Sequence, residues 1–314
     1  PTPTGAGLFT FVKASAALTS DDSDVREVKF NTDGTKMFML GRANDKAYEY
    51  SVSTAFDVST ITYAQSLDVS GQDVSSNSIE FNTDGTILIM LGQNNDKVYE
   101  YALSTGFDLS TASYTDSFDI STQELQPYGL AFNNDGTKMY VTGWAGDDIN
   151  EYTLTTGFDV STATYSQNFD VSSQAGKPSA VQFQSDGTTM YVLNGSGAPT
   201  IFKYTLSTAF DVSTITYVRT LDISVVSATQ GDNSANSIEF NTDGTKLFVL
   251  GQGQDKVDEY ALSTGFDLST ASFTHSFSIA SQEILPYGLA FNNDGTKMFV
   301  TGWAGDDINE YTLS

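Results

Sequence analysis

The sequence predicts an all-β fold, a single six-bladed β-propeller of four-stranded antiparallel blades, and two observations support that prediction. The first is a motif, Phe-x-x-Asp-Gly-Thr, which starts at Phe30, Phe81, Phe132, Phe183, Phe240 and Phe291, with a spacing of 51 residues broken once by 57. A repeat with a period of roughly 20–50 residues is typical of solenoids, propellers and arrays. The second is that every repeat has strand patterns and none has sustained helical periodicity, which selects the propeller.

The second repeat illustrates how each strand is recognised. Residues Ser76–Asn82 alternate as an innermost strand should, and the Asp84-Gly85 pair then suits a tight hairpin because glycine adopts a positive φ at little cost. Residues Ile87–Leu91 are apolar on both faces, as expected for a second strand buried between neighbouring blades. A third strand is expected at Lys97–Leu103, and an outermost strand at about Ala112–Ile120.

The two ends of the chain predict how the ring closes. The last repeat stops at Ser314, directly after its third strand, while a spare strand pattern occurs at Leu8–Lys13. Pairing the two would make the N-terminal strand the outermost strand of blade six and would protect an open sheet edge. The blades of this single domain are expected at about residues 24–70, 75–121, 126–172, 177–224, 234–280, and 285–314 together with 7–18.

The motif and the strand after it, such as FNTDGTKMFMLG at Phe30–Gly41 and FNNDGTKMYVTG at Phe132–Gly143, resemble the YVTN-type and TolB-type propeller repeats. This resemblance covers the first half of all six repeats. The second half, such as STGFDLST at residues 104–111, is a longer connection, similar to repeats of uncharacterised marine bacterial and phage proteins. The resemblance implies the fold and no particular activity, because propellers include lactonases, lyases, receptors and scaffolds.

Composition excludes several classes of partner. The chain has 14 basic and 39 acidic residues, a formal charge of −25, which repels nucleic acid and anionic membrane surfaces. No run of about 18 apolar residues predicts a membrane span. The absence of cysteine excludes disulfides, thiol nucleophiles and the usual structural zinc sites. We expect a monomer that binds a carbohydrate or protein ligand, with an extracellular or virion-surface location favoured.

The ring is also internally duplicated. Residues 77–155 and 236–314 are identical at 64 of 79 aligned positions, so repeats two and three recur as repeats five and six. Repeats one and four share STAFDVSTITY, starting at Ser53 and Ser207. Repeats three apart lie opposite each other in a ring of six. The sequence therefore predicts two near-identical sides across the channel, interrupted at repeat four by Asn194–Thr200 and by extra residues near 225–231.

One end of the channel is the expected binding surface. The residue four positions before each motif phenylalanine varies with repeat type, as in a ring that faces a ligand: Arg26, Asn77, Tyr128, Ser179, Asn236 and Tyr287. A loop containing Trp144, Asp147 and Asp148 recurs with Trp303, Asp306 and Asp307. A tryptophan beside carboxylates suits stacking on a sugar ring and hydrogen bonding to its hydroxyls. The alternative is that each tryptophan packs over the next blade's loop while Asp147 turns the chain.

Metal and catalytic candidates are weaker. Glu80 and Glu239, one position before their motif phenylalanines, are of the type found in metal-dependent lactonases, although Lys29 beside Glu80 offers simple neutralisation. Asp21-Asp22-Ser23-Asp24 is a candidate for Ca²⁺ without the spacing of an EF-hand. The only histidine, His275, is expected on an outer surface, so no Ser-His-Asp triad can form.

Three functions follow in order of preference. A ligand-binding module acting through the channel mouth is favoured over catalysis. The alternatives are a metal-dependent hydrolase or lactonase in the channel, and a structural component of a larger surface or virion protein.

Overall fold

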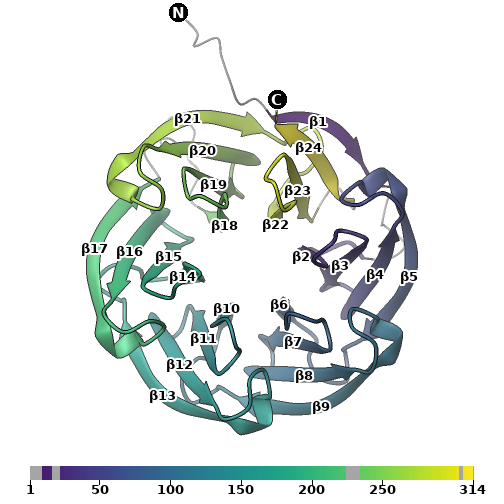
Figure 1. Cartoon of the computed structure of the whole chain (residues 1–314), viewed down its shortest axis with the longest axis horizontal. Coiled ribbons are helices and arrows are strands. Elements are labelled where there is room, and N and C mark those ends of the chain that lie inside the picture. The colour runs from purple at the N-terminus through teal and green to yellow at the C-terminus, as the bar shows by residue number, and fades with distance from the viewer. Residues whose placement is uncertain (1–8, 16–21, 224–233, 304–306, 314) are drawn as a thin grey trace, which may run out of the picture.

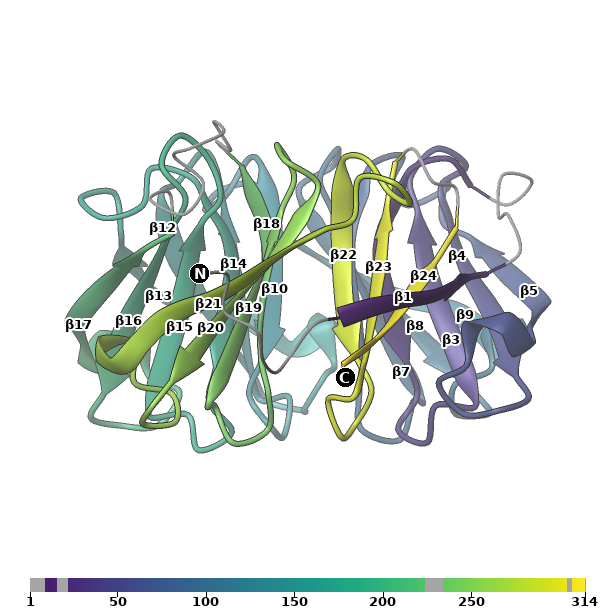
Figure 2. The same cartoon turned by 90° about the horizontal axis from the view of Figure 1, so that it is seen from above.

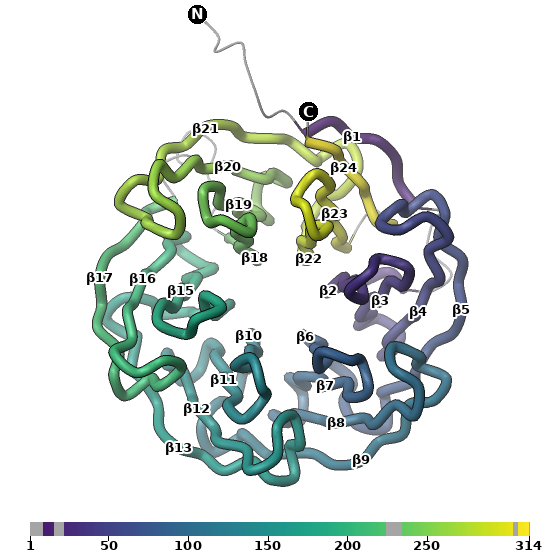
Figure 3. The backbone as a smooth tube through the Cα atoms, viewed as in Figure 1, coloured from purple at the N-terminus to yellow at the C-terminus, as the bar shows by residue number. Residues whose placement is uncertain are grey.

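The computed structural model describes residues 9–15, 22–223, 234–303 and 307–313. Six four-stranded antiparallel sheets surround a central channel, which confirms the predicted propeller (Figure 1). Figure 3 follows the backbone once around the ring, with the innermost strand of every blade at the centre. No helix in the described part of the chain is long and apolar enough to cross a membrane.

The strand bounds follow the repeats closely. Blade one contains β2 (Val25–Phe30), β3 (Lys36–Gly41), β4 (Lys46–Val52) and β5 (Ile61–Asp68). Blade two contains β6 (Ser76–Phe81), β7 (Ile87–Gly92), β8 (Lys97–Leu103) and β9 (Ala112–Asp119). Blade three contains β10 (Pro127–Phe132), β11 (Lys138–Gly143), β12 (Asp148–Leu154) and β13 (Ala163–Asp170).

The second half-ring repeats this order. Blade four contains β14 (Pro178–Phe183), β15 (Thr189–Asn194), β16 (Thr200–Leu206) and β17 (Ile215–Asp222). Blade five contains β18 (Ala235–Phe240), β19 (Lys246–Gly251), β20 (Lys256–Leu262) and β21 (Ala271–Ser278). Blade six contains β22 (Pro286–Phe291), β23 (Lys297–Gly302) and β24 (Asn309–Leu313), and β1 (Phe9–Ala14) completes it.

The Asp-Gly-Thr motif forms the hairpin between the first two strands of each blade. In blade two, Gly85 has φ +72°, and Asp84 Oδ1 accepts hydrogen bonds from the Thr86 amide at 3.0 Å and the Thr86 hydroxyl at 2.6 Å. The asparagine that begins the turn accepts from the backbone at its far side, since Asn82 Oδ1 lies 3.0 Å from the Ile87 amide. The motif therefore recurs because these side chains form the turn.

A single 3₁₀ turn connects the third strand to the fourth in blades one to five. These turns are η1 (Val58–Thr60), η2 (Leu109–Thr111), η3 (Val160–Thr162), η4 (Val212–Thr214) and η5 (Leu268–Thr270). The aspartate before each turn caps it, as Asp108 does by accepting from the Ser110 amide at 3.0 Å. We call these capped segments, each with its preceding phenylalanine, the Phe-Asp turns.

The glutamates of the third strands link one blade to the next. Glu49 of blade one accepts from the Leu109 amide of blade two at 2.7 Å, and Glu100 of blade two accepts from the Val160 amide at 2.8 Å. Their place in the middle of a strand predicts bonds to neighbouring strands. Both kinds of bond occur. Glu49 accepts from Lys36 of β3 at 2.7 Å and from Gln65 of β5 at 2.6 Å, and it also serves as the acceptor for the N–H group of the neighbouring blade's Phe-Asp turn.

The hydrophobic core lies between the blades. In one of six similar clusters, Phe38 and Leu40 of blade one pack with Leu88, Met90 and Tyr101 of blade two. The apolar second strands therefore bury both faces, as their sequence predicts.

The N-terminal strand closes the ring, as predicted. Strand β1 pairs antiparallel with β24, with Phe9 opposite Leu313 and a register shift between Phe11 and Lys13. Figure 2 shows the purple β1 lying beside the yellow β24 at the outer edge of blade six. Phe9 is buried, and its ring centroid lies 5.5 Å from that of Phe248 in blade five. Closure therefore includes core packing as well as strand pairing.

Candidate channel-mouth site

The innermost strands of all six blades enclose a channel cavity of about 700 Å³. Its walls carry the side chains that alternate inward from β2, β6, β10, β14, β18 and β22. We call one end the mouth, defined by the residues four positions before each motif phenylalanine together with the loops after β3, β11 and β19. The Asp-Gly hairpins belong to the opposite end.

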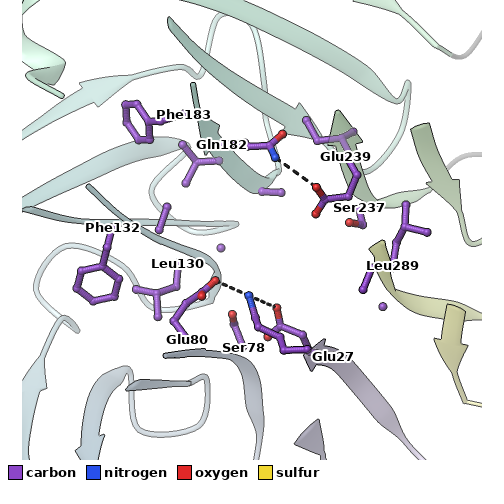
Figure 4. A pocket seen from close by; sticks show the side chains of 18 of the residues that line it. Glu27, Ser78, Glu80, Leu130, Phe132, Gln182, Phe183, Ser237, Glu239 and Leu289 are labelled. Carbon is purple, nitrogen blue, oxygen red and sulfur yellow. Dashed lines mark hydrogen bonds and ion pairs between the residues drawn. The ribbon is translucent and has the colours of Figure 1, made fainter. Parts of the chain in front are cut away.

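A charged group occupies one side of the channel. Lys29 Nζ lies 2.6 Å from Glu80 Oε1 and 3.1 Å from Glu27 Oε1, so the expected pair between Lys29 and Glu80 is present (Figure 4). Burial alone would lower the pKa of Lys29, but Glu27 and Glu80 outweigh it and hold that pKa above its ordinary value. Burial raises the pKa of Glu80, and the nearby ammonium opposes this.

The opposite side of the channel carries a neutral amide where the first side has the lysine. Gln182 Nε2 donates to Glu239 Oε2 at 3.4 Å, a long hydrogen bond (Figure 4). Burial raises the pKa of Glu239 to about 7, with Lys29 and Gln182 opposing the shift. Glu239 therefore changes protonation state near neutral pH, in contrast to Glu80, which has its own ammonium partner.

The two candidate metal ligands do not form a common site with a third acid. Glu80 bonds to Lys29 and Glu239 to Gln182, and a lysine ammonium already lies between Glu27 and Glu80. Across the residues that the structure describes, no group of three or more His, Asp or Glu side chains is placed to hold a metal ion. The donor set in the channel therefore does not fit the lactonase-type metal centre, and we derive no step through a metal.

The mouth contains a second cavity of about 230 Å³. It collects six of the residues predicted to bind ligand, namely Arg26, Asn77, Tyr128, Trp144, Asn236 and Tyr287. The pocket also includes Arg42 and Gln252, which were not predicted from the sequence. A signal for them was present, because both occupy the position that Trp144 and Trp303 occupy in their own repeats.

Trp144 contacts both a tyrosine ring and a lysine ammonium at the mouth. Its ring lies nearly parallel to that of Tyr128, with centroids 4.2 Å apart and an interplanar angle of 13°. Lys177 Nζ, from the start of blade four, lies 4.7 Å from the Trp144 ring centroid. The tyrosine ring and the lysine ammonium therefore both lie over the indole ring of Trp144.

Trp303 is placed differently, although its loop sequence is identical. Its side chain is 51% exposed, and it is absent from the residues that line the mouth pocket. Its tyrosine has another partner, because the Arg26 guanidinium carbon lies 4.0 Å from the Tyr287 ring centroid. Arg26 is held by Asp24, whose Oδ2 lies 2.8 Å from Arg26 Nη2. The two tyrosines therefore differ in their partners: Tyr128 stacks on Trp144, and Tyr287 carries the Arg26 guanidinium over its ring.

The carboxylates of the tryptophan loops are mostly engaged in local structure. Asp147 adopts φ +51°, as do the equivalent Asp45, Asp96 and Asp255 within 1°, so it turns the chain. Asp148 is buried and accepts from Asn150 and Asn168, each at 2.6 Å; burial raises its pKa. Asp307 accepts from Asn309 at 2.7 Å, and Asp306 lies outside the described residues.

Asn77 and Asn236 join the mouth to the next blade. Asn77 Nδ2 donates to the Pro127 carbonyl at 2.8 Å, and Asn236 Nδ2 donates to the Pro286 carbonyl at 2.7 Å. Each asparagine therefore fixes the start of the adjacent innermost strand directly before Tyr128 or Tyr287. The two amides position the tyrosines as well as lining the pocket.

Buried acids accept hydrogen bonds from the backbone amides of the mouth loops, a role that the sequence pattern does not reveal. Glu124 Oε1 accepts from the Ala145 amide at 3.0 Å, and Glu124 Oε2 accepts from the Gly146 amide at 3.2 Å. Asp22 does the same for Ala43 and Asn44, at 3.0 and 2.9 Å. Asp22 is therefore engaged as a loop support rather than open to Ca²⁺, and its neighbour Asp21 lies outside the described residues.

Blade four differs from this plan. Ala175 replaces the buried acid, and Asn194 Nδ2 instead donates to the carbonyls of Ser196 and Ala198 at 3.1 and 3.2 Å. The loop at 194–200 is thus held by its own asparagine. The extra residues near 225–231 lie outside the described residues.

Comparisons with known proteins identify the fold alone. No family model and no curated protein matches the chain. Among solved structures, the chain is similar to a functionally unknown protein from Desulfotomaculum acetoxidans, with 14% identity, a TM-score of 0.62 and coverage of 92% of this chain and 84% of that one. A candidate 6-phosphogluconolactonase from Bacteroides uniformis has 12% identity, a TM-score of 0.65 and coverage of 92% and 82%.

The β-propeller domain of Cps50 (Swd1) from Myceliophteria thermophila has 11% identity and a TM-score of 0.64, with coverage of 98% of this chain and 100% of that one. At such identities these similarities establish a β-propeller and leave the activity open.

Proposed function

We propose that this protein is a carbohydrate-binding module whose site is the mouth of the channel. The observation that carries the proposal is the mouth pocket, in which two tyrosines, a tryptophan and two asparagines converge. Binding pockets combine apolar rings with a few fixed polar groups, as this pocket does. Rings and amides together match a sugar, which has apolar faces and hydroxyl edges.

The charge of the pocket favours a sugar that carries a carboxylate or a sulfate. The chain has only three arginines, and two of them, Arg26 and Arg42, line this one pocket. In a protein with a net charge of −25, this placement concentrates positive charge beside one cavity, and because Asp24 already pairs with Arg26, Arg42 is the arginine proposed to meet the anion. Arginine presents a planar donor fork that matches carboxylate geometry.

Binding to a glycan array that contains uronic-acid, sulfated and neutral oligosaccharides tests the proposal. We expect acidic glycans to bind, and the Arg42→Gln variant to lose at least roughly tenfold in affinity for them, because a charge-assisted hydrogen bond is worth about 1.5–3 kcal/mol. Arg219→Gln is the matched control, since glutamine occupies the equivalent position in β5 and β13 as Gln65 and Gln167. Equal losses in both variants, or no bound glycan, would contradict the proposal.

Glu239 supports a second candidate, a hydrolase that works in the channel without a metal. A carboxyl with a pKa of about 7 inside a cavity is suited to general acid–base catalysis at neutral pH. Hydrolysis of sugar lactones is the reaction to assay, because one similar structure is a candidate 6-phosphogluconolactonase. The expected result is turnover that Glu239→Gln abolishes and Glu80→Gln retains; turnover unaffected by Glu239→Gln would exclude this role.

A further inference from the structure

Two opposite walls of the channel are built on equivalent positions but carry different side chains. On the wall formed by blades one and two, Lys29 Nζ lies 2.6 Å from Glu80 Oε1 and 3.1 Å from Glu27 Oε1 (Figure 4). Glu27 Oε2 also accepts from the Ile79 amide at 2.7 Å. The protein's own ammonium therefore neutralises the carboxylates of this wall.

The wall formed by blades four and five keeps one carboxylate and lacks the ammonium. Ala180 and Gln182 lie three positions and one position before the motif phenylalanine of blade four, where blade one has a glutamate and the lysine. Glu239 of blade five corresponds to Glu80 of blade two. No ion pair of the described residues includes Glu239. This carboxylate therefore has no adjacent cation.

Gln182 replaces the lysine poorly. Its Nε2 donates to Glu239 Oε2 at 3.4 Å, longer than the usual N–H···O distance of about 2.9–3.0 Å. Its Oε1 is buried and has no hydrogen-bond partner within the described part of the chain. Because buried polar groups are nearly always paired, an amide with one long bond and one unpaired oxygen is not an optimised partner. Glu239 stays available to a stronger donor.

The channel has room for such a donor beside Glu239. Ala180 is smaller than the glutamate of blade one, and Ala290 holds the position of Glu239 in the next blade around the ring. Both alanines line the channel cavity of about 700 Å³ together with Glu239, which is partly exposed to it. Ser179 and Asn236 line both this cavity and the mouth pocket. The mouth therefore offers a ligand a route to Glu239.

The charges around Glu239 favour an added cation. Lys29, across the channel, is bound by two carboxylates, so its wall has a net negative charge. The neighbouring strands β14 and β22 contribute Gln182 and Ala290, which carry no charge. Burial raises the pKa of Glu239 to about 7, which agrees with a carboxylate that no cation contacts directly.

We propose that the wall formed by blades four and five binds the primary ammonium group of a small ligand, which takes the place opposite Lys29 and pairs with the Glu239 carboxylate. An ammonium fits because it is the group that the protein itself places on the equivalent wall. Ser237 lines the same cavity and adds a hydroxyl acceptor (Figure 4). Amino sugars and aliphatic amines share this group. The inference goes beyond the proposed acidic-glycan site, because Arg42 and the rings of the mouth take no part in it.

Calorimetric titration of the protein with two matched pairs of probes tests the proposal. Butylamine is compared with butanol, and glucosamine with N-acetylglucosamine, because only the first member of each pair carries an ammonium. We expect at least one amine to bind at least about tenfold more tightly than its neutral partner, since a charge-assisted bond to the carboxylate is then lost. Binding of butylamine would show that an aliphatic ammonium is sufficient, and binding of glucosamine alone would add the sugar ring as a requirement.

Three variants test whether the amine binds at this wall. Glu239→Gln removes the charge and should weaken amine binding by at least about tenfold. Gln182→Lys supplies a built-in ammonium, as Lys29 does on the equivalent wall, and should block the site to a similar extent. Asp116→Asn removes one negative charge from the exposed face of β9 and should leave the affinity unchanged, which controls for general attraction of cations to an acidic protein. Thermal melting verifies that each variant is folded.

The pH dependence of binding gives an independent readout. Butylammonium, like lysine, keeps its proton between about pH 6 and 8, whereas Glu239 with a pKa of about 7 ionises in this range. The affinity should therefore rise about tenfold from pH 6 to 8 in the unmodified chain and stay level in Glu239→Gln. The other charged groups that act on Glu239, namely Lys29, Glu27 and Glu80, are present in both chains.

Two results would overturn the proposal. One is that neither amine binds more tightly than its neutral partner. The other is amine binding that survives Glu239→Gln, or that falls equally in Asp116→Asn. Either result is distinct from a failure of the acidic-glycan proposal, which is decided with anionic probes and Arg42→Gln.

Discussion

The two half-rings differ where the sequence least suggests it. Blades two and three are nearly copies of blades five and six, yet Glu80 is paired with an ammonium while Glu239 is not, and Trp144 is stacked while Trp303 is exposed. Blades one and four, which lie beside the duplicated pairs, supply different neighbours on the two sides, and blade six itself differs beside Trp303, because Leu285 adopts φ +57° where blade three has Gln126. Lys29 is replaced by Gln182, Asp24 by Lys177, and Arg26 by Ser179.

The environment of a channel or mouth residue is therefore set at the boundary between two blades. A side chain at the mouth or in the channel contacts the next blade as much as its own, so an unchanged loop changes its environment when its neighbour changes. A substitution in one blade should accordingly change the contacts of residues in the adjacent blade.

The largest effect is expected from removing the strand that closes blade six. Deleting residues 1–18 removes β1 and with it the edge pairing of β24 and the buried Phe9. We expect the melting temperature to fall by more than about 10 °C, because loss of a core phenylalanine alone costs about 3–5 kcal/mol. Hydrogen exchange should report the loss first in blade six and later in blade three, whose outermost strand β13 is intact. A melting temperature within about 1–2 °C of the full chain's would show that β1 does not close the ring.

Replacing the lysine on one side of the channel should lower the free energy of unfolding far more than replacing the glutamine on the opposite side. Lys29→Met leaves Glu27 and Glu80 without their shared cation, and breaking such a buried group typically costs about 3–5 kcal/mol. The Lys29 and Glu80 side chains keep 27% and 30% exposure to the channel, so we expect about 2–3 kcal/mol by urea denaturation at neutral pH. Gln182→Met, which removes one long hydrogen bond, should cost under about 1 kcal/mol. Similar losses would mean that the two sides are equivalent.

Alanine substitutions of the two tryptophans should differ in how much they destabilise the protein, and this difference can be measured without a ligand. Trp144→Ala loses the stack on Tyr128 and the contact with Lys177, and we expect about 2 kcal/mol of destabilisation. Trp303→Ala removes a half-exposed ring and should change stability by no more than about 0.5 kcal/mol. If Trp303 binds sugar, its loss weakens glycan binding without this structural cost. Equal destabilisation of both variants in thermal melts would show that the half-rings hold their tryptophans alike.

The free energy of unfolding should depend on pH through Glu239, on the side of the channel without the lysine. The pKa of Glu239 in the folded protein is raised to about 7, so the folded state binds more protons than the unfolded state between about pH 4.5 and 7. Its contribution to stability is therefore complete below that range and declines as the pH rises to 7. Denaturation curves at about pH 5 and 8 measure how much the free energy of unfolding falls between these pH values. We expect this fall to be about 1–2 kcal/mol smaller in Glu239→Gln than in the unmodified chain. An unchanged decline would indicate that Glu239 ionises normally.

The smallest change in stability, and the sharpest test of the difference between the half-rings, comes from exchanging the neighbours of Trp303. The double variant D24K/R26S gives blade six the lysine and serine that follow blade three, and it frees the ring of Tyr287 from Arg26. We expect Trp303 to stack on Tyr287 with a net change of no more than about 1 kcal/mol. Near-ultraviolet circular dichroism and a crystal structure would detect the stack. A Trp303 that stays exposed would mean that features other than the two neighbours decide its position.

Much of the fold was predictable because it depends on local chemistry that repeats. The Asp-Gly-Thr motif predicted each hairpin, since Asp84 and Gly85 form the turn from within it. Closure by the N-terminal strand followed from one strand missing at the end and one spare at the start. The bond from Glu49 to the next blade could not be predicted, because residues 60 positions apart meet only after the blades have packed.

The sequence predicted several of the residues that lie at the channel mouth, but not how their side chains are arranged. Alignment of the repeats placed Arg26, Tyr128 and Asn236 at the mouth, since equivalent positions of a ring must face the same axis. Arg42 was not predicted, because the tryptophan loops match each other and differ from the loops of the other four repeats. Asp148 was predicted to meet the ligand; in the structure its carboxylate is buried and accepts hydrogen bonds from Asn150 and Asn168, which the repeat pattern did not indicate.

By itself, then, the sequence determined the number of blades, the strand order, the closure and which positions surround the channel. These depend on periodicity and on short turns, whose energetics are complete within a few residues. Only the tertiary structure decided that Glu80 pairs with an ammonium while Glu239 bonds to an amide, and that identical loops hold Trp144 and Trp303 differently. Those outcomes depend on which side chain the adjacent blade places within hydrogen-bonding or stacking distance, and ring closure alone sets that distance.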